Sequence, residues 1–178
     1  EKPLIPMNLP PEIRLEFLEN DTLEHKFERG ELDALLSLYI PEAFLRGSPD
    51  IVRMFPNYKE VEKDYYRRTG IYPIMHTVVL REDVYREHPW AARSIYDAFC
   101  KARDIAVEGL YDTDALRLTL PFLLDHVEET WATFGKAFWP YGIEANRPTW
   151  TAIGEYVHEQ GLAPRVVTPE ELFAPGFT

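Results

Sequence analysis

The 178-residue sequence contains a single cysteine, Cys100, and lacks both an internal repeat and a long apolar run. One cysteine excludes an internal disulfide and a cysteine-rich zinc site. No stretch approaches the roughly 18 consecutive apolar residues of a membrane-spanning helix. We therefore expect a chain that acts in the cytoplasm and has no membrane partner.

Positive charge is scarce as well. The 19 lysines and arginines face 30 aspartates and glutamates, which gives a net charge of −11, and Arg67 and Arg68 are the only adjacent basic pair. Such acidity opposes binding to phosphate backbones, so nucleic acid is not an expected partner. A small anion is still compatible with the composition, because a binding site responds mainly to nearby arginines and backbone dipoles.

Hydrophobic periodicity and capping signals predict a mixture of strands and helices. Period-two or compact apolar runs predict strands at residues 13–18, 32–40 and 72–81. Spacings of three and four predict helices at residues 113–119, 121–134 and 148–160, the last with Asn146 as a candidate cap, together with a long helix starting at His88-Pro89. Capping boxes predict a helix at residues 21–29, from Asp21 and Glu24, and a short one after Thr168, from Thr168 and Glu171. Apolar and aromatic residues predict short helices between residues 50 and 68. Strand, helix, strand order is typical of an α/β fold, but three strands are too few for a covered parallel sheet.

The opening segment, residues 1–11, carries four prolines and has neither a start methionine nor a signal-like apolar core. This composition is typical of a linker. We therefore expect the chain to be the later part of a longer protein, whose missing N-terminal part supplies the remaining strands of the sheet.

His76 lies in the middle of the apolar run at residues 72–81. Alternation puts it on the same face as Ile74, Val78 and Leu80. If that face is covered, the imidazole needs a partner, because an unpaired buried polar group is costly. Two interpretations stay open from this run alone, a core histidine bonded to a backbone carbonyl or a histidine facing a ligand.

Several longer stretches resemble the 4,5-dihydroxyphthalate decarboxylase family. The similarity extends from about Leu9 nearly to the C-terminus. It is carried by six segments, GELDA at 30–34, AFLRGSP at 43–49, YYRRTGIYPIMHT at 65–77, WPYGIEANR at 139–147, HEQGL at 158–162 and EELFAP at 170–175. One departure is the bulky stretch LSLYIP at 36–41, where the family has small and basic residues.

The resemblance implies an α/β, type 2 periplasmic-binding-protein-like fold of two lobes with the ligand between them, whose N-terminal part is absent from this chain. Residues 1–71 would then be the remaining part of the second, middle lobe. Residues 72–178 would hold the crossover strand and the C-terminal helices that complete the first lobe.

The resemblance also implies a lyase that removes one carboxylate as CO2 from a small aromatic dicarboxylate such as 4,5-dihydroxyphthalate. Each carboxyl-bearing carbon of that substrate has a phenolic hydroxyl para to it. The ring itself can therefore supply electrons, and no organic cofactor is expected. Such an enzyme must hold the retained carboxylate and deliver a proton to the ring carbon.

For these roles we assign His76 as the general acid or base, because the reference pKa of histidine, about 6.5, suits both at neutral pH. Arg46 is the leading carboxylate clamp, since a guanidinium binds a carboxylate through two hydrogen bonds and Gly47 permits a close approach. A solvated surface arginine is the alternative for Arg46.

Further substrate contacts are expected from Tyr39, at the end of a predicted strand, and from Arg67. Trp139 and Tyr141 could form walls around an aromatic ring, with ordinary core packing as the alternative for both. His88, His126 and His158 have no paired ligand spacing, and His126 with Glu129 forms only a chance-level i, i+3 pair, so no metal site is predicted.

A rival function from another class is a solute-binding protein that captures a small anionic or aromatic ligand without changing it. Both functions need arginines and aromatic rings in the site, but only the enzyme needs a proton donor aimed at a ring carbon. The sequence leaves the oligomeric state open, a homo-oligomer included.

Overall fold

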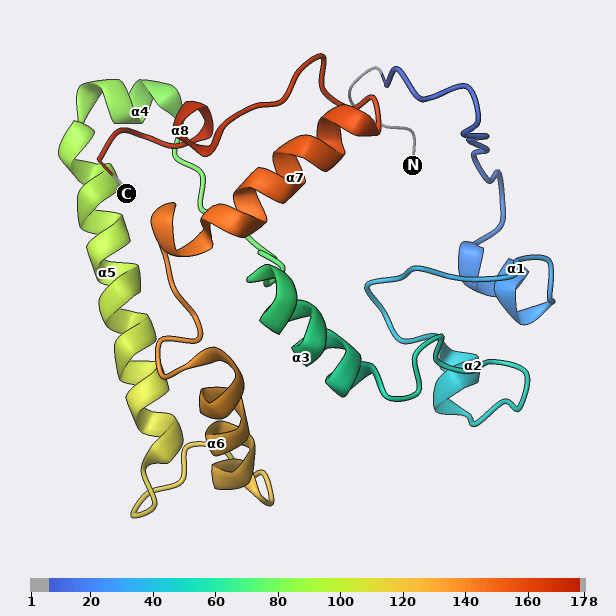
Figure 1. Cartoon of the computed structure of the whole chain (residues 1–178), viewed down its shortest axis with the longest axis horizontal. Helices are drawn as coiled ribbons and strands as arrows, with labels where there is room; N and C mark the ends of the chain where they lie inside the picture. Colours follow the sequence, from blue (N-terminus) through green and yellow to red (C-terminus); the bar gives the residue numbers. More distant parts are fainter. Residues whose placement is uncertain (1–6, 177–178) are drawn as a thin grey trace.

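The computed structural model describes residues 7–176, so part of the predicted linker, with Pro3 and Pro6, lies outside the described residues. All regular elements within that range are helical (Figure 1). They are α1 Leu23–Glu28, α2 Glu42–Leu45, α3 Tyr58–Thr69, α4 Glu82–Glu87, α5 Pro89–Glu108, η1 Gly109–Tyr111, α6 Leu123–Phe134, η2 Glu144–Asn146, α7 Arg147–Glu159 and α8 Pro169–Leu172.

The predicted α/β, two-lobed fold is wrong, because residues 7–176 contain no strand. The stretches 13–18, 32–40 and 72–81 are irregular chain and form no strand pairing within the described residues. An alternating apolar pattern produces a strand only where another strand satisfies its backbone hydrogen bonds. No such partner lies beside these stretches in the described chain, so their side-chain pattern alone did not decide their structure.

The longer helices follow the predicted pattern closely. α5 starts with Pro89 at its first position, where the missing N–H of proline costs no hydrogen bond. α7 ends before Gly161, whose φ of +72° suits glycine. The predicted capping box of α8 is also confirmed, since the Thr168 N–H donates to Oε2 of Glu171 at 2.9 Å.

Two predicted details of the helices differ from the structure. The N-cap of α1 is Thr22, whose hydroxyl accepts from the His25 N–H at 3.1 Å, and not Asp21. The helix predicted at residues 113–119 does not form. Oδ1 of Asp112 accepts from the backbone N–H of Asp114 and of Ala115, as an N-cap residue would, but the residues after it do not continue as a helix.

The helices bury little apolar surface against one another. The buried apolar residues have small or medium-sized side chains and include Ala43, Leu123, Val127 and Ile143. No large side chain in the described range is fully buried. The solvent-accessible surface is 14633 Å², whereas a compact monomer of this mass exposes about 9,000 Å². Closest packing is mostly between chain neighbours, as for α4 with α5 and α7 with α8.

Figure 1 shows α1 and α2 as a group apart from α4 to α8, with α3 between them. Contacts from α3 to α6 are aromatic and ionic. The Tyr66 ring on α3 lies 4.5 Å from the Phe134 ring on α6, and Lys59 and Lys63 both pair with Glu129. Among the helices described, none has the length and apolar character needed to cross a bilayer.

Candidate functional site

Tyr39 and Arg46 lie in the group formed by α1 and α2. Tyr39 is on irregular chain with 82% of its surface exposed. Arg46 directly follows α2, and its guanidinium donates to Oε2 of Glu42 at 3.4 Å and to Oε1 of Glu28 at 3.3 Å. Exposed pairs of this kind are weak, so a stronger carboxylate ligand could displace them.

His76 and Arg67 are both exposed. His76 lies on the segment between α3 and α4 and makes no hydrogen bond or ion pair with the described residues. The face predicted to contain it is only partly covered, since Val78 is exposed. The imidazole is therefore not a buried core group bonded to a carbonyl.

Trp139 and Tyr141 belong to the loop that follows α6, and Asn146 fixes the shape of this loop. Nδ2 of Asn146 donates to the carbonyl oxygens of Pro140 at 3.0 Å and Gly142 at 2.9 Å. Asn146 was predicted to cap α7, but its side chain makes no hydrogen bond to that helix. Its amide instead satisfies two loop carbonyls that would otherwise lack donors.

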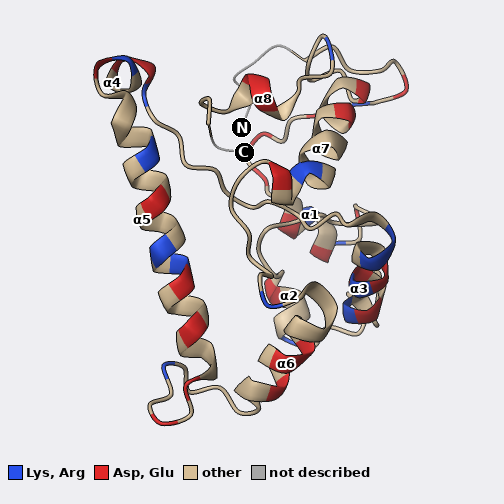
Figure 2. Ribbon diagram, turned by 60° about the vertical axis from the view of Figure 1, so that its left-hand side comes forward, with Lys and Arg blue, Asp and Glu red and all other residues tan. Residues whose placement is uncertain are grey.

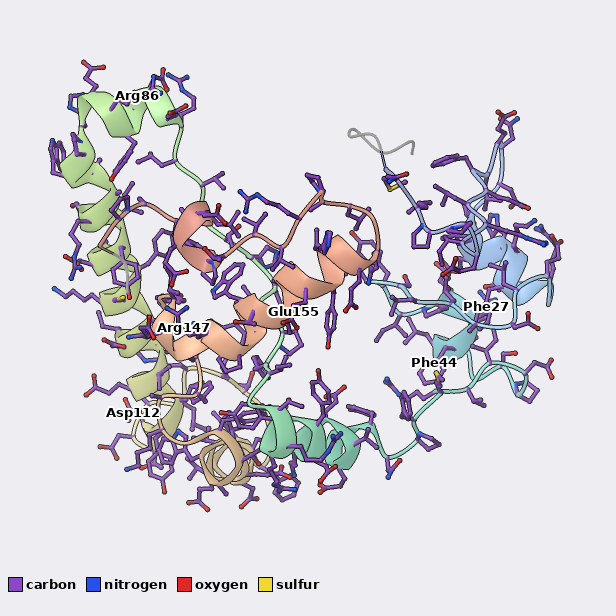
Figure 3. The ribbon with its side chains drawn as sticks, turned by 45° about the horizontal axis from the view of Figure 1, so that its top comes forward. Phe27, Phe44, Arg86, Asp112, Arg147 and Glu155 are labelled. Atoms are coloured by element: carbon purple, nitrogen blue, oxygen red, sulfur yellow. The ribbon has the colours of Figure 1, made fainter. Side chains whose placement is uncertain are left out.

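The loop forms one side of a hollow of about 570 Å³ with the C-terminal half of α5 and with α6. This volume lies in the usual range for small-molecule sites. The lining residues that carry charge are Arg103, Asp104, Glu108 and Lys136, and those with a large ring are Tyr111, Trp131, Trp139 and Tyr141. Figure 3 shows the labelled Asp112 at this end of α5, with Phe44 of the α2 group on the other side of the molecule.

Arg103 connects α5 to the loop. Its guanidinium lies 4.9 Å from the centroid of the Tyr141 ring and donates to the Trp139 carbonyl oxygen at 3.4 Å. It also pairs with Oδ1 of Asp104 at 2.7 Å. The side chain is only 23% exposed, so three kinds of contact hold this cation beside the aromatic rings.

Across the hollow, Lys136 lies over the indole of Trp131, with its ammonium 5.1 Å from the ring centroid. Trp131 also stacks on Tyr111, with centroids 5.0 Å apart, and its buried indole N–H has no acceptor. The Tyr111 hydroxyl donates to Glu128 at 2.9 Å, and this hydrogen bond raises the pKa of Tyr111 above its usual value. The hollow thus joins cations to aromatic faces.

Of the residues assigned from the sequence, Trp139 and Tyr141 therefore share one hollow, whereas Tyr39, Arg46, Arg67 and His76 do not line it. Arg103 and Lys136 carry no local sequence signal, because Arg103 meets the loop only through a contact with Trp139, 36 residues further along the chain. Within residues 7–176, no three His, Cys, Asp or Glu side chains gather closely enough to hold a metal ion.

The chain is 31% identical over 157 residues to a 4,5-dihydroxyphthalate decarboxylase from Comamonas testosteroni. The chain is distantly related to this decarboxylase. The alignment covers 88% of the chain but 48% of the relative, so the chain spans about half the relative's length. No protein-family model matches the chain.

Proposed function

We propose that this chain takes part in removing one carboxylate, as CO2, from an aromatic dicarboxylate such as 4,5-dihydroxyphthalate. The observation that carries the proposal is the 31% identity over 157 residues to a decarboxylase of that name. The hollow beside Trp139 and Tyr141 adds support, because its rings and cations match the chemistry of an aromatic anion.

In the proposed reaction, the phenolate para to the departing carboxylate pushes electrons into the ring, and the carboxyl-bearing carbon takes up a proton. The C–C bond to the carboxylate then breaks, and its electron pair restores the aromatic ring and the phenolate. The products are CO2 and 3,4-dihydroxybenzoate, with one proton consumed. The substrate itself accepts the electrons in this scheme, so the proposal includes no organic cofactor.

His76 is the proposed proton donor. Its imidazole is exposed and makes no hydrogen bond within the described range, which leaves it available for proton transfer. Tyr39, Arg46 and Arg67 are the proposed further substrate contacts. They lie on separate exposed segments, so in this proposal they reach the substrate only in a larger assembly.

The proposed assembly joins this chain to a polypeptide that corresponds to the half of the relative it does not span. The accessible surface of 14633 Å², far above that of a compact monomer of this mass, supports such a partner. Exposed apolar residues such as Leu36 and Leu38, at 99% and 98%, would be covered in it. The division of the chain near residue 72 stays a prediction.

A second candidate function is capture of a small aromatic anion without chemistry. The observation that favours it is the lining of the hollow, where cations and rings are present but no imidazole. A binding site needs only those groups, whereas a decarboxylase also needs a proton donor at the ring carbon.

The test is to incubate the chain with 4,5-dihydroxyphthalate, alone and after co-expression with the polypeptide that covers the other half of the relative. Formation of CO2 and 3,4-dihydroxybenzoate would support the lyase. His76→Gln should then lower kcat by about 100-fold or more with little change in KM, while the control His25→Gln, another exposed histidine, should not. Binding without product would favour the second candidate, and neither binding nor product would overturn both.

A further inference from the structure

We infer that Lys136, together with the aromatic rings that Arg103 holds in place, forms the subsite that binds the carboxylate of a flat aromatic acid. This inference rests on the proposed function and names the groups that recognise its substrate. Neither cation was indicated by the sequence. Both line the hollow of about 570 Å³ formed by α5, α6 and the loop after α6.

The first argument is that Lys136 has no carboxylate partner within the described residues. Its ammonium lies over the Trp131 ring and has no carboxylate within salt-bridge distance in the described part of the chain. In a protein with 30 acidic residues, most basic side chains near a helix find such a partner, as Lys59 and Lys63 do on α3. Figure 2 shows basic and acidic residues following one another along α5. A bound carboxylate would supply the missing partner of Lys136.

The second argument is the geometry of Arg103. Asp104 already neutralises its charge, and the Tyr141 ring and the Trp139 carbonyl hold its guanidinium in place. Arg103 therefore acts as a positioning residue that fixes the Tyr141 ring at the rim. The ring of a planar ligand can then stack against a preformed aromatic surface.

The third argument concerns Glu108, the other acid in the lining. Its carboxylate has no cation partner among the residues described and would repel an anion placed against it. A phenolic hydroxyl, in contrast, can donate a hydrogen bond to this carboxylate. The combination of a free ammonium, aromatic faces and a free carboxylate thus favours an aromatic acid that also has hydroxyl groups.

The test measures binding by calorimetry, with phthalate and 4,5-dihydroxyphthalate as probes. Phthalate has the two carboxylates but no phenol to drive decarboxylation, so its binding is read without turnover. Lys136→Gln should weaken the binding of both probes by about tenfold. The matched control Lys101→Gln, an exposed lysine of α5 outside the hollow, should leave both unchanged.

Two more readouts locate the ligand and test the role of Glu108. The indole NMR signals of Trp131 and Trp139 should shift on addition of phthalate. Glu108→Gln should reduce the preference for 4,5-dihydroxyphthalate over phthalate by several-fold. Cyclohexane-1,2-dicarboxylate has the same charges without the aromatic ring and should bind more weakly than phthalate.

The inference is overturned if phthalate binds equally well to the parent chain and to Lys136→Gln, or if the signals of Trp131 and Trp139 do not respond. If the chain decarboxylates its substrate but either of these results is found, the proposed function is kept and the substrate binds at another site. Binding that depends on Lys136 without any decarboxylation would support the subsite and contradict the lyase.

Discussion

The hydroxyl of Thr149 on α7 forms two hydrogen bonds with the backbone of Tyr72, 77 residues earlier in the chain. It accepts from the Tyr72 N–H at 3.2 Å and donates to the Tyr72 carbonyl oxygen at 3.0 Å. The Tyr72 ring then lies 5.2 Å from Phe134 and 5.9 Å from Trp139. One buried hydroxyl thereby ties α7 to the aromatic cluster behind the hollow.

Replacing the buried Thr149 by valine should destabilise the chain by about 1–3 kcal/mol, because the half-buried N–H and C=O of Tyr72 would both lose their partner. Valine keeps the shape of threonine, so the change tests the hydroxyl and not the volume. Urea unfolding followed by circular dichroism measures the difference. The control Thr151→Val, an exposed position on the same helix, should change stability by less than about 0.5 kcal/mol. Equal effects at both positions would contradict the role of the hydroxyl.

Asn146→Asp should loosen the loop with Trp139 and Tyr141, because a carboxylate cannot donate to the carbonyls of Pro140 and Gly142 and would repel them. We expect a loss of stability of about 1–3 kcal/mol and weaker phthalate binding. The matched control is Asn57→Asp, since the exposed Asn57 makes no side-chain hydrogen bond at the start of α3. If phthalate binds to Asn146→Asp as it does to Asn57→Asp, the loop does not depend on this amide.

The pairing of Glu129 with Lys59 and Lys63 predicts a pH-dependent contact between α3 and α6. Hydrogen bonds from Lys59 and then from Lys63 lower the pKa of Glu129 from 4.5 to about 2. Because the pKa is lower in the folded state, the contact stabilises the fold above pH 4.5, and this stabilisation is lost as the pH falls toward 2.

Glu129→Gln should therefore lower the urea midpoint at pH 6, and the gap to the parent chain should narrow as the pH approaches 2. High salt should narrow it too, because the pairs are exposed. The control Glu62→Gln changes an exposed glutamate of α3 without an ion pair in the described chain and should show no such trend. A gap that stays constant from pH 6 to pH 2.5 would argue against the ion pairs.

Leu38 is exposed and Leu123 is buried, so only the truncation of Leu123 should lower the stability of the isolated chain. Leu123 is only 8% exposed, so Leu123→Ala should lower the free energy of unfolding by about 2 kcal/mol or more. Leu38→Ala should leave the stability of the isolated chain unchanged and weaken only its association with the proposed partner polypeptide. Unfolding curves of both variants and co-purification with that polypeptide check this. Loss of stability on Leu38→Ala would mean that the segment is already covered in the isolated chain.

The helices were predictable because their signals are local. Pro89 at the start of α5 and the Thr168–Glu171 capping box of α8 act within one or two turns, and the structure contains both. The strands were not, because a strand needs a partner that the sequence of the strand does not specify. The compact apolar run at residues 32–40 and the alternating run at residues 72–81 both form no sheet.

The same distinction applies to the site. Trp139 and Tyr141 could be selected from their own segment, and they line one hollow. Arg103 and Lys136 could not, since each is an ordinary basic residue until α5 and the loop meet. His76 was selected for its chemistry within an apolar run, but its exposure depends on what covers that run.

By itself, the sequence determined the net charge of −11, the single thiol, the positions of the longer helices and the likeness to a decarboxylase. The tertiary structure alone decided that no strands pair within residues 7–176, that Thr149 holds Tyr72, and that Arg103 lies against Tyr141. Net charge follows from the composition alone, and helical periodicity follows from residues three and four positions apart. Strand pairing and a binding hollow, in contrast, arise from contacts between segments that are distant along the chain.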